Sequence, residues 1–292
     1  MICNLCPRKC GVDRTKTTGF CSVTDTLKIS RAALHFYEEP PISAQNGSGT
    51  VFFSGCNLRC VYCQNKEISR GFGKEISVTR LSQIFLELQE SGAHNINLVT
   101  PDHFVPQIKS ALVLAKENGL SIPIVYNTSG YCSVESLRLL DGLVDIYLTD
   151  FKYFDDALSL KYSGAKDYKH VAKLATKEMF RQVGYPKFDE NGVMQKGVIV
   201  RHLVLPGFLD NSKDILEYLY ATYKDDIYIS IMNQFTPINL EKFPEINRTV
   251  SEQEYQEIVM FANMLGIKHA FVQEGKTQSE SFIPDFSCFE GV

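Results

Sequence analysis

Short apolar runs alternate with longer amphipathic stretches along most of this chain, and this alternation restricts the fold more than any other feature. The runs are rich in Val, Ile, Tyr and Phe and are apolar on both faces, as strands are when helices cover a sheet. They lie at residues 50–55, 95–100, 122–129, 144–150, 197–207 and 227–232, with a further one at 269–273. Helical patterns occupy residues 78–91, 104–118, 133–140, 166–183, 210–222 and 251–264. Six strand-to-helix units predict an α/β fold with a parallel sheet.

Polar residues gather where these runs end. They include Ser54, Thr100, His103, Asn127, Ser129, Asp150, Lys152, Arg201, His202, Asn233 and Gln234. A barrel or partial barrel and a doubly wound sheet both satisfy the pattern. In barrels of this kind the active site is built from the carboxyl ends of the strands. We therefore expect the functional site at that edge of the sheet.

Three segments follow from where the alternation starts and stops. Residues 1–49 fall outside it and are rich in cysteine, residues 50–274 carry the strand and helix units, and residues 275–292 form a non-repetitive tail. Either end segment is placed to fold over the mouth of a barrel.

Charge and hydropathy exclude several classes of partner. The net charge is −4, and the 30 Lys and Arg residues are dispersed, so we expect no nucleic-acid polymer as partner. No stretch approaches about 18 uninterrupted apolar residues, and the first residues lack a basic region followed by an apolar run. We expect a cytoplasmic protein with no membrane partner.

The chain has nine cysteines, and their distribution indicates metal binding. A reducing compartment disfavours a disulfide framework, which leaves metal ligation or buried thiols. Seven cysteines fall in two clusters before residue 64, whereas Cys132 and Cys288 stand alone. Clustered thiols indicate a metal, and the two isolated cysteines are expected to be small buried apolar residues.

The second cluster places Cys56, Cys60 and Cys63 in the segment "GCNLRCVYC". A zinc site closes its tetrahedron with four protein ligands or with three and a water, whereas each iron of a cubane cluster takes one thiolate. Three cysteines therefore leave one iron of a cubane open to bind something else. Gly55 allows the chain to turn out of the preceding strand without a side-chain clash.

This segment resembles the CxxxCxxC loop of the radical S-adenosylmethionine (SAM) superfamily, with the aromatic Tyr62 before the last cysteine. The resemblance covers most of residues 50–290 and is strongest to the branch that contains the pyruvate formate-lyase activating enzyme. It implies a partial TIM-like (β/α)6 barrel, a 4Fe-4S cluster on the three cysteines, and SAM bound at the open iron. It also implies reductive cleavage of SAM to a 5'-deoxyadenosyl radical that abstracts hydrogen, with an electron donor such as flavodoxin or ferredoxin. The alternative is a structural zinc loop or an electron-transfer cluster.

The same resemblance assigns roles to residues at the ends of the second and third runs. The segment "NINLVTPDH" stands where the superfamily usually has a Gly-Gly-Glu motif that binds the SAM amino group, so Thr100 and Asp102 are the expected acceptors here. Asn127 and Ser129 lie in "YNTSG", at the level where activating enzymes contact SAM, and Tyr62 is also expected to contact the cofactor. For His103, a surface position at a helix start and a catalytic role both stay open.

Further roles follow for the fourth, fifth and sixth runs. Asp150 and Lys152 resemble the Asp-x-Lys of the activating enzymes and, two apart in a strand, face the same side, so both are expected in the lumen as catalytic residues. Arg201 is expected to bind the SAM carboxylate through its planar guanidinium, and its neighbour His202 to face the helices as a structural residue. Asn233 and Gln234 are the expected rim contacts to adenine or substrate.

The first cluster, in "CNLCPRKC...GFC", provides four further thiols. Cys3, Cys6, Cys10 and Cys21 are spaced by two, three and ten residues, which is a full set of ligands for one metal site. Zinc, an auxiliary iron-sulfur cluster and four unligated thiols are the three interpretations.

Two kinds of substrate are compatible with this chemistry. In one, the protein activates a glycyl-radical enzyme, and a loop of that partner enters the barrel. In the other it acts on a small molecule, resembling the queuosine-salvage lyases that release queuine from its nucleoside. The two end segments favour an enclosed lumen and hence a small molecule. A non-catalytic metal-binding module is the third alternative.

Overall fold

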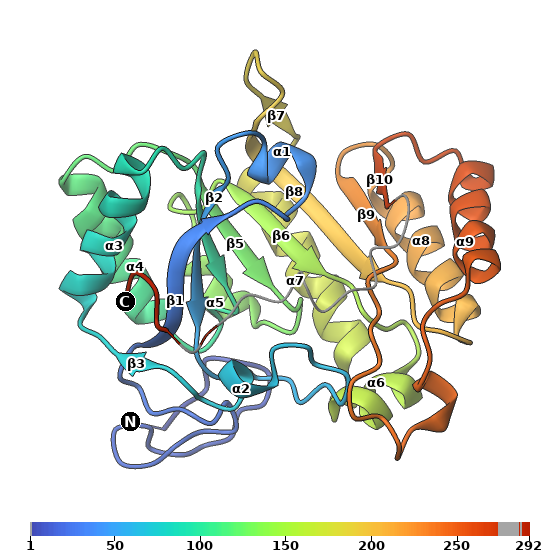
Figure 1. Ribbon diagram of the computed structural model, residues 1–292, viewed down its shortest axis with the longest axis horizontal. Helices are drawn as coiled ribbons and strands as arrows, with labels where there is room; N and C mark the ends of the chain where they lie inside the picture. Colours follow the sequence, from blue (N-terminus) through green and yellow to red (C-terminus); the bar gives the residue numbers. More distant parts are fainter. Residues whose placement is uncertain (1, 274–285, 287) are drawn as a thin grey trace.

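The computed structural model describes residues 2–273, 286 and 288–292 of the 292-residue chain. Its strands form one ten-stranded sheet in the order β10-β9-β8-β6-β5-β4-β2-β1-β3, with β7 (Lys187–Phe188) paired to β8 (Figure 1). The parallel strands are β2 (Ser48–Phe53), β4 (Ile96–Val99), β5 (Ile124–Thr128), β6 (Ile146–Asp150), β8 (Met194–Leu203), β9 (Tyr228–Met232) and β10 (Ala270–Val272). Within the described residues the edge strands β10 and β3 do not pair, so the sheet is open. All seven runs predicted from the sequence are strands.

The N-terminal segment contributes a strand that the sequence pattern did not reveal. β1 (Lys28–His35) runs antiparallel to β2, and β3 (Lys74–Glu75) runs antiparallel to β1. Residues 1–49 therefore supply part of the sheet as well as a cysteine-rich loop, and β2 begins two residues before the expected boundary. Most of the expected tail, 275–292, lies outside the described residues, but the backbone N–H of Ala32 donates to the carbonyl of Glu290 (2.8 Å).

Helices connect the parallel strands and cover the outer face of the sheet (Figure 1). They are α3 (Val78–Glu90), α4 (Val105–Glu117), α5 (Val134–Arg138), α6 (Asp156–Ser163), α7 (Tyr168–Val183), α8 (Leu209–Tyr223) and α9 (Glu252–Leu265). Side-chain caps fix several of their starts, as Ser77 does for α3 and Ser251 for α9. Among the described residues, no helix combines the length and apolar character that crossing a membrane requires.

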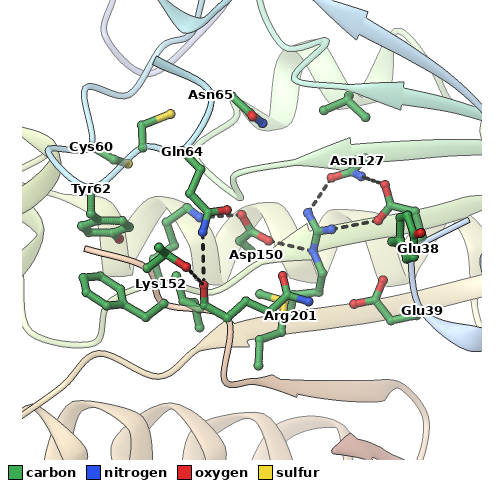
Figure 2. A pocket seen from close by; sticks show the side chains of 18 of the residues that line it. Glu38, Glu39, Cys60, Tyr62, Gln64, Asn65, Asn127, Asp150, Lys152 and Arg201 are labelled. Carbon is green, nitrogen blue, oxygen red and sulfur yellow. Dashed lines mark hydrogen bonds and ion pairs between the residues drawn. The ribbon is translucent and has the colours of Figure 1, made fainter. Parts of the chain in front are cut away.

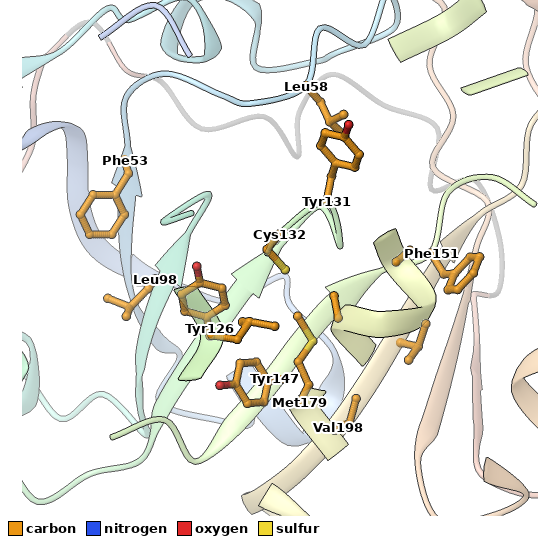
Figure 3. Close-up of a cluster of buried hydrophobic side chains, with 14 of the residues drawn as sticks. Phe53, Leu58, Leu98, Tyr126, Tyr131, Cys132, Tyr147, Phe151, Met179 and Val198 are labelled. Atoms are coloured by element: carbon orange, nitrogen blue, oxygen red, sulfur yellow. The ribbon is translucent and has the colours of Figure 1, made fainter. Parts of the chain in front are cut away.

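The main core lies between the sheet and these helices (Figure 3). Tyr126 and Tyr147, on neighbouring strands, pack edge to face with ring centroids 5.8 Å apart, and Met179 of α7 covers them. Each such buried side chain contributes about 1.5–3 kcal/mol to stability. On the inner face, Ile42 of the short helix α1 (Pro40–Ser43) packs against Val125 and Ile199. Helix α1 thus fills the lumen near the amino ends of the strands.

We expect Gly130→Ala to destabilise the fold by about 3 kcal/mol, which is several times the effect of Gly142→Ala. Both glycines have a positive φ, +76° and +79°. A Cβ at Gly130, however, lies 2.2 Å from the carbonyl oxygen of Asp150, whereas a Cβ at Gly142 meets no atom within 4 Å. Urea unfolding of both variants measures the difference. Equal losses of stability would show that the close approach of the β5 and β6 ends is not restrictive.

Candidate functional site

The three-cysteine loop lies at the carboxyl end of β2, where the sequence predicts it. It follows Gly55, whose φ is +90° and where a Cβ would lie 2.5 Å from the carbonyl oxygen of Cys21. The amide of Cys56 donates to that same carbonyl (3.2 Å), so the N-terminal loop packs directly on the cysteine loop. Only glycine fits this turn, for reasons of both conformation and space.

The environment of the three thiols fits an iron-sulfur cluster. The backbone N–H of Leu58 donates to the Cys56 sulfur (3.4 Å), and the hydroxyl of Ser163 donates to the Cys60 sulfur (2.9 Å). Hydrogen bonds to sulfur are one of the ways proteins set cluster potentials. Burial raises the pKa of the Cys56 and Cys60 thiols, so their thiolates need a bound cation to be stable. All three cysteines line a cavity of about 330 Å³.

The spacing of the thiols disfavours a single metal ion. Among the described residues, no group of three or more His, Cys, Asp or Glu side chains is arranged to hold one ion. A zinc ion bonded to sulfurs at about 2.3 Å requires them close together. A cubane accepts a wider arrangement because each thiolate binds its own iron. The loop therefore suits a cubane better than zinc.

Tyr62 anchors this loop through a chain of hydroxyl groups. Its hydroxyl lies 2.5 Å from that of Tyr153, which lies 2.8 Å from the Ser163 hydroxyl that bonds Cys60. Tyr62 is buried and packs against Phe235 with ring centroids 5.5 Å apart. Because its hydroxyl is already bonded, Tyr62 presents its ring to the neighbouring cavity.

A second cavity, of about 300 Å³, lies on the inner face of the sheet and shares Cys60 and Cys63 with the first. Figure 2 shows Cys60 and Tyr62 at one end of it and Glu38 and Glu39 at the other. Its remaining lining residues are His35, Tyr37, Phe52, Gln64, Asn65, Val99, Asn127, Asp150, Lys152, Arg201, Leu203, Met232, Gln234, Phe235 and Thr236. A ligand in this cavity therefore reaches the cysteine loop.

Asp150, Lys152 and Arg201 form an ion network in the middle of this cavity. Asp150 contacts the Lys152 ammonium at 2.6 Å and the Nε of Arg201 at 2.9 Å. Although burial acts to raise it, the pKa of Asp150 is lowered by these two cations. Both Asp150 and Lys152 line the lumen, as their spacing in the strand predicts.

Glu38 and Glu39, which the sequence pattern does not single out, complete the polar lining. The Nη1 of Arg201 lies 3.2 Å from Glu38, whose other oxygen accepts from the amides of Asn97 (2.9 Å) and Asn127 (3.2 Å). Burial raises the pKa of both glutamates. They precede the strand-helix alternation, and their only signal is a pair of acidic residues before Pro40.

The other residues expected near SAM lie at different depths. Asn127 and Gln234 line the cavity. Asn233 is buried beside it, and its backbone N–H donates to Gln273 (2.7 Å). The hydroxyl of Ser129 is buried and has no hydrogen-bond partner among the described residues. Arg201 already uses three of its five N–H donors, the third bonding Asn127 at 2.6 Å, which leaves two for a carboxylate.

The expectation that Asp102 and Thr100 bind the SAM amino group is not supported, because neither residue lines the cavity. Asp102 accepts hydrogen bonds from Thr128 (2.8 Å) and Tyr126 (3.1 Å) on the outer face of the sheet, and burial raises its pKa to about 6. Thr100 has a φ of +58°, so the chain turns there and carries Asp102 away from the lumen. A β-branched residue rarely adopts this conformation.

His103 and His202 are both buried. His103 is buried, with Nε2 2.8 Å from the carbonyl of Ser54, and burial lowers its pKa to about 3. The surface interpretation of His103 is therefore wrong, and the residue does not line the lumen cavity. His202 faces the helices, as predicted, and its ring nitrogens lie 2.8 Å from the Phe151 carbonyl and the Ser212 hydroxyl.

The N-terminal loop packs against the cysteine loop through Arg8. Its guanidinium donates to the carbonyls of Asn57 (2.8 Å) and Ser163 (3.0 Å) and stacks over Phe20. The four thiols of this segment do not meet in the geometry of a single ion in the described structure, so the expected zinc site gains no support. Of the two isolated cysteines, Cys132 is buried as expected, but Cys288 is exposed, contrary to expectation.

Comparisons with known proteins extend this picture. A family model described as the radical SAM superfamily matches residues 50–219. An uncharacterized protein of Methanocaldococcus jannaschii is 30% identical over 269 residues, which are 89% of this chain and 74% of that protein. A pyruvate formate-lyase-activating enzyme of Staphylococcus aureus is 23% identical over 200 residues, which are 63% of this chain and 73% of that enzyme.

Solved structures resemble the fold at low sequence identity. Streptococcus suis SuiB, solved bound to S-adenosylmethionine, superposes with a TM-score of 0.51 and 11% identity over 76% of this chain and 49% of SuiB. HydG, a maturase of the FeFe-hydrogenase, gives 0.50 and 17% over 78% of this chain and 52% of HydG. The chain spans about half the length of these two proteins. Their likeness confirms the expected partial barrel, open on one side.

Proposed function

The chain belongs to the radical SAM superfamily, whose members use a 4Fe-4S cluster and SAM, and we propose that this protein uses them to act on a small molecule. The best candidate is a queuosine-type nucleoside, whose base is released by cleavage of a C–N bond. The cavity that shares Cys60 and Cys63 with the cysteine loop carries this proposal.

Several residues of this chain suit the binding of the cluster and SAM. Cys56, Cys60 and Cys63 are the proposed cluster ligands. The cluster and SAM together supply the radical chemistry when bound. Asp150 and Lys152 orient the bound molecules through charge, and Tyr62 and Phe235 exclude water at the cysteine end of the cavity. Arg201 retains two N–H donors for a carboxylate.

The lining of the cavity supports a small substrate over a protein loop. Asp150, Lys152, Arg201 and Glu38 are largely buried and bonded to one another, which suits a ligand that is fixed by a few polar contacts. The alternative, installation of a glycyl radical on a partner protein, is favoured by the similarity to the pyruvate formate-lyase-activating enzyme of S. aureus.

We propose that the electron donor is an acidic carrier such as flavodoxin or ferredoxin. Arg59, Lys66 and Arg70 line the cavity of the cysteine loop, although the chain as a whole has a net charge of −4. A local cationic rim beside a redox centre speeds encounter with an anionic partner.

For the four N-terminal thiols we propose an auxiliary iron-sulfur cluster in preference to zinc. Because the thiols are not arranged around one ion, a cluster with one iron per thiolate fits better.

Anaerobic incubation of the reduced, reconstituted protein with SAM and queuosine tests the function. We expect 5'-deoxyadenosine to form faster with the nucleoside than without it, and free queuine to appear in equal amount. Mass spectrometry measures both products. If SAM is cleaved but no nucleoside changes the rate, the substrate proposal is wrong and a glycyl signal on a partner protein becomes the next test. No SAM cleavage at all would favour a non-catalytic metal-binding module.

A further inference from the structure

Glu39 has a buried carboxylate oxygen with no partner, at the end of the lumen away from the cysteines. The residue is 8% exposed and lines the cavity. Its Oε2 is buried and has no hydrogen-bond partner among the described residues. A buried acceptor without a donor is costly, so this position favours a ligand that supplies one.

The neighbouring carboxylate, that of Glu38, has no oxygen left without a partner. The carboxylate of Glu38 is occupied by Arg201, Asn97 and Asn127. The guanidinium of Arg201 also donates to Asp150 and Asn127, and Figure 2 marks no hydrogen bond or ion pair from it to Glu39. Glu39 is therefore the carboxylate of this end of the cavity that a ligand can engage.

Aromatic rings line the cavity around this end. His35 contacts the ring of Tyr37 at 5.7 Å and that of Phe52 at 6.2 Å between centroids, and all three residues line the cavity. Burial lowers the pKa of His35, which favours its neutral ring. Flat apolar rings beside a carboxylate suit a planar heterocycle with an edge of N–H donors.

We propose that Glu39 determines substrate specificity by accepting hydrogen bonds from the N–H and amino groups on the edge of a guanine-type heterocycle. A guanine or 7-deazaguanine ring carries a ring N–H beside an exocyclic amino group, and this edge can donate to the partnerless Oε2 of Glu39. This inference rests on the proposed function, since it names the recognition element for the base of the proposed nucleoside.

Equilibrium dialysis of the anaerobically reconstituted full chain against queuine, guanine and hypoxanthine tests the proposal. Hypoxanthine lacks the exocyclic amino group. We expect queuine and guanine to bind more tightly than hypoxanthine, and Glu39→Gln to weaken queuine binding about 10- to 100-fold, since a charged hydrogen bond is lost and an amide N–H faces the donor edge. Glu39→Asp should restore part of the affinity. Glu75→Gln, at an exposed position of β3, removes the same charge and should change nothing.

Several outcomes would overturn the role of Glu39. These are equal affinity of the wild type and Glu39→Gln for queuine, equal binding of guanine and hypoxanthine, or no binding of queuine to the wild type. Thermal unfolding and the iron content of each variant report whether it folds. If Glu39→Gln does not fold, the queuine affinity of Glu39→Asp tests the role of Glu39 instead. SAM cleavage by the wild type is measured separately, so its absence contradicts the proposed function while the dialysis still decides the role of Glu39.

Discussion

Replacing Cys60 with alanine is expected to abolish SAM cleavage and to lower the iron content by about four atoms per chain. Cys60 lines both the loop cavity and the lumen cavity, and its sulfur accepts a hydrogen bond from Ser163. Losing one of three thiolates leaves a second iron without a protein ligand, so the cluster is not retained. Iron analysis, the visible absorption of the cluster and the yield of 5'-deoxyadenosine measure the effect.

Two other cysteines provide matched controls for this variant. Cys132→Ala removes a thiol that is buried in the core, whereas Cys60 is only partly buried, so it should alter stability slightly and leave the iron content unchanged. Cys10→Ala should lower the metal content of the N-terminal segment while the cluster of the loop stays in place. Full iron content and SAM cleavage in Cys60→Ala would contradict the assignment of the cluster to this loop.

The parallel part of the fold was predictable because strands that are buried on both faces are rich in apolar and β-branched residues. The central parallel strands are buried along their whole length, as β2 and β5 are, and most of their residues are apolar or β-branched. β1 could not be predicted in this way, because it is an antiparallel strand near the edge and several of its side chains are only partly buried. Its segment "KISRAALH" mixes charged and apolar residues without a distinct period.

The candidate site was predictable where a strand alone fixes the side-chain direction, and unpredictable where a turn does. Asp150 and Lys152 follow the alternation of β6 into the lumen. Asp102 comes after the left-handed turn at Thr100, which reverses the side its carboxylate faces. Glu38 and Glu39 enter the lumen from a segment far away in the sequence, and only the pairing of β1 with β2 places them there.

Asp150→Asn is expected to destabilise the protein by about 3–5 kcal/mol and to lose most SAM-dependent activity. The carboxylate contacts Lys152 and Arg201, each with a side-chain exposure of 16%. Removing its charge leaves two buried cations poorly compensated, because burial raises the pKa of Glu38 and so weakens the nearest other anion. Urea unfolding near pH 7 measures the loss. The lowered pKa of Asp150 means that its contribution is fully present there and is lost only as the pH falls through that value.

Comparison with an exposed pair and with a double variant separates charge burial from other effects of Asp150→Asn. Asp141→Asn removes the same charge beside Arg181, where both side chains are about half exposed, and should cost less than about 1 kcal/mol. Adding Lys152→Met to Asp150→Asn removes one uncompensated cation, so the double variant should be more stable than Asp150→Asn alone. If Asp150→Asn is as mild as Asp141→Asn, or if Lys152→Met only adds to the damage, the network does not act as a buried, charge-balanced unit. In that case the lumen has other means of stabilising Lys152 and Arg201.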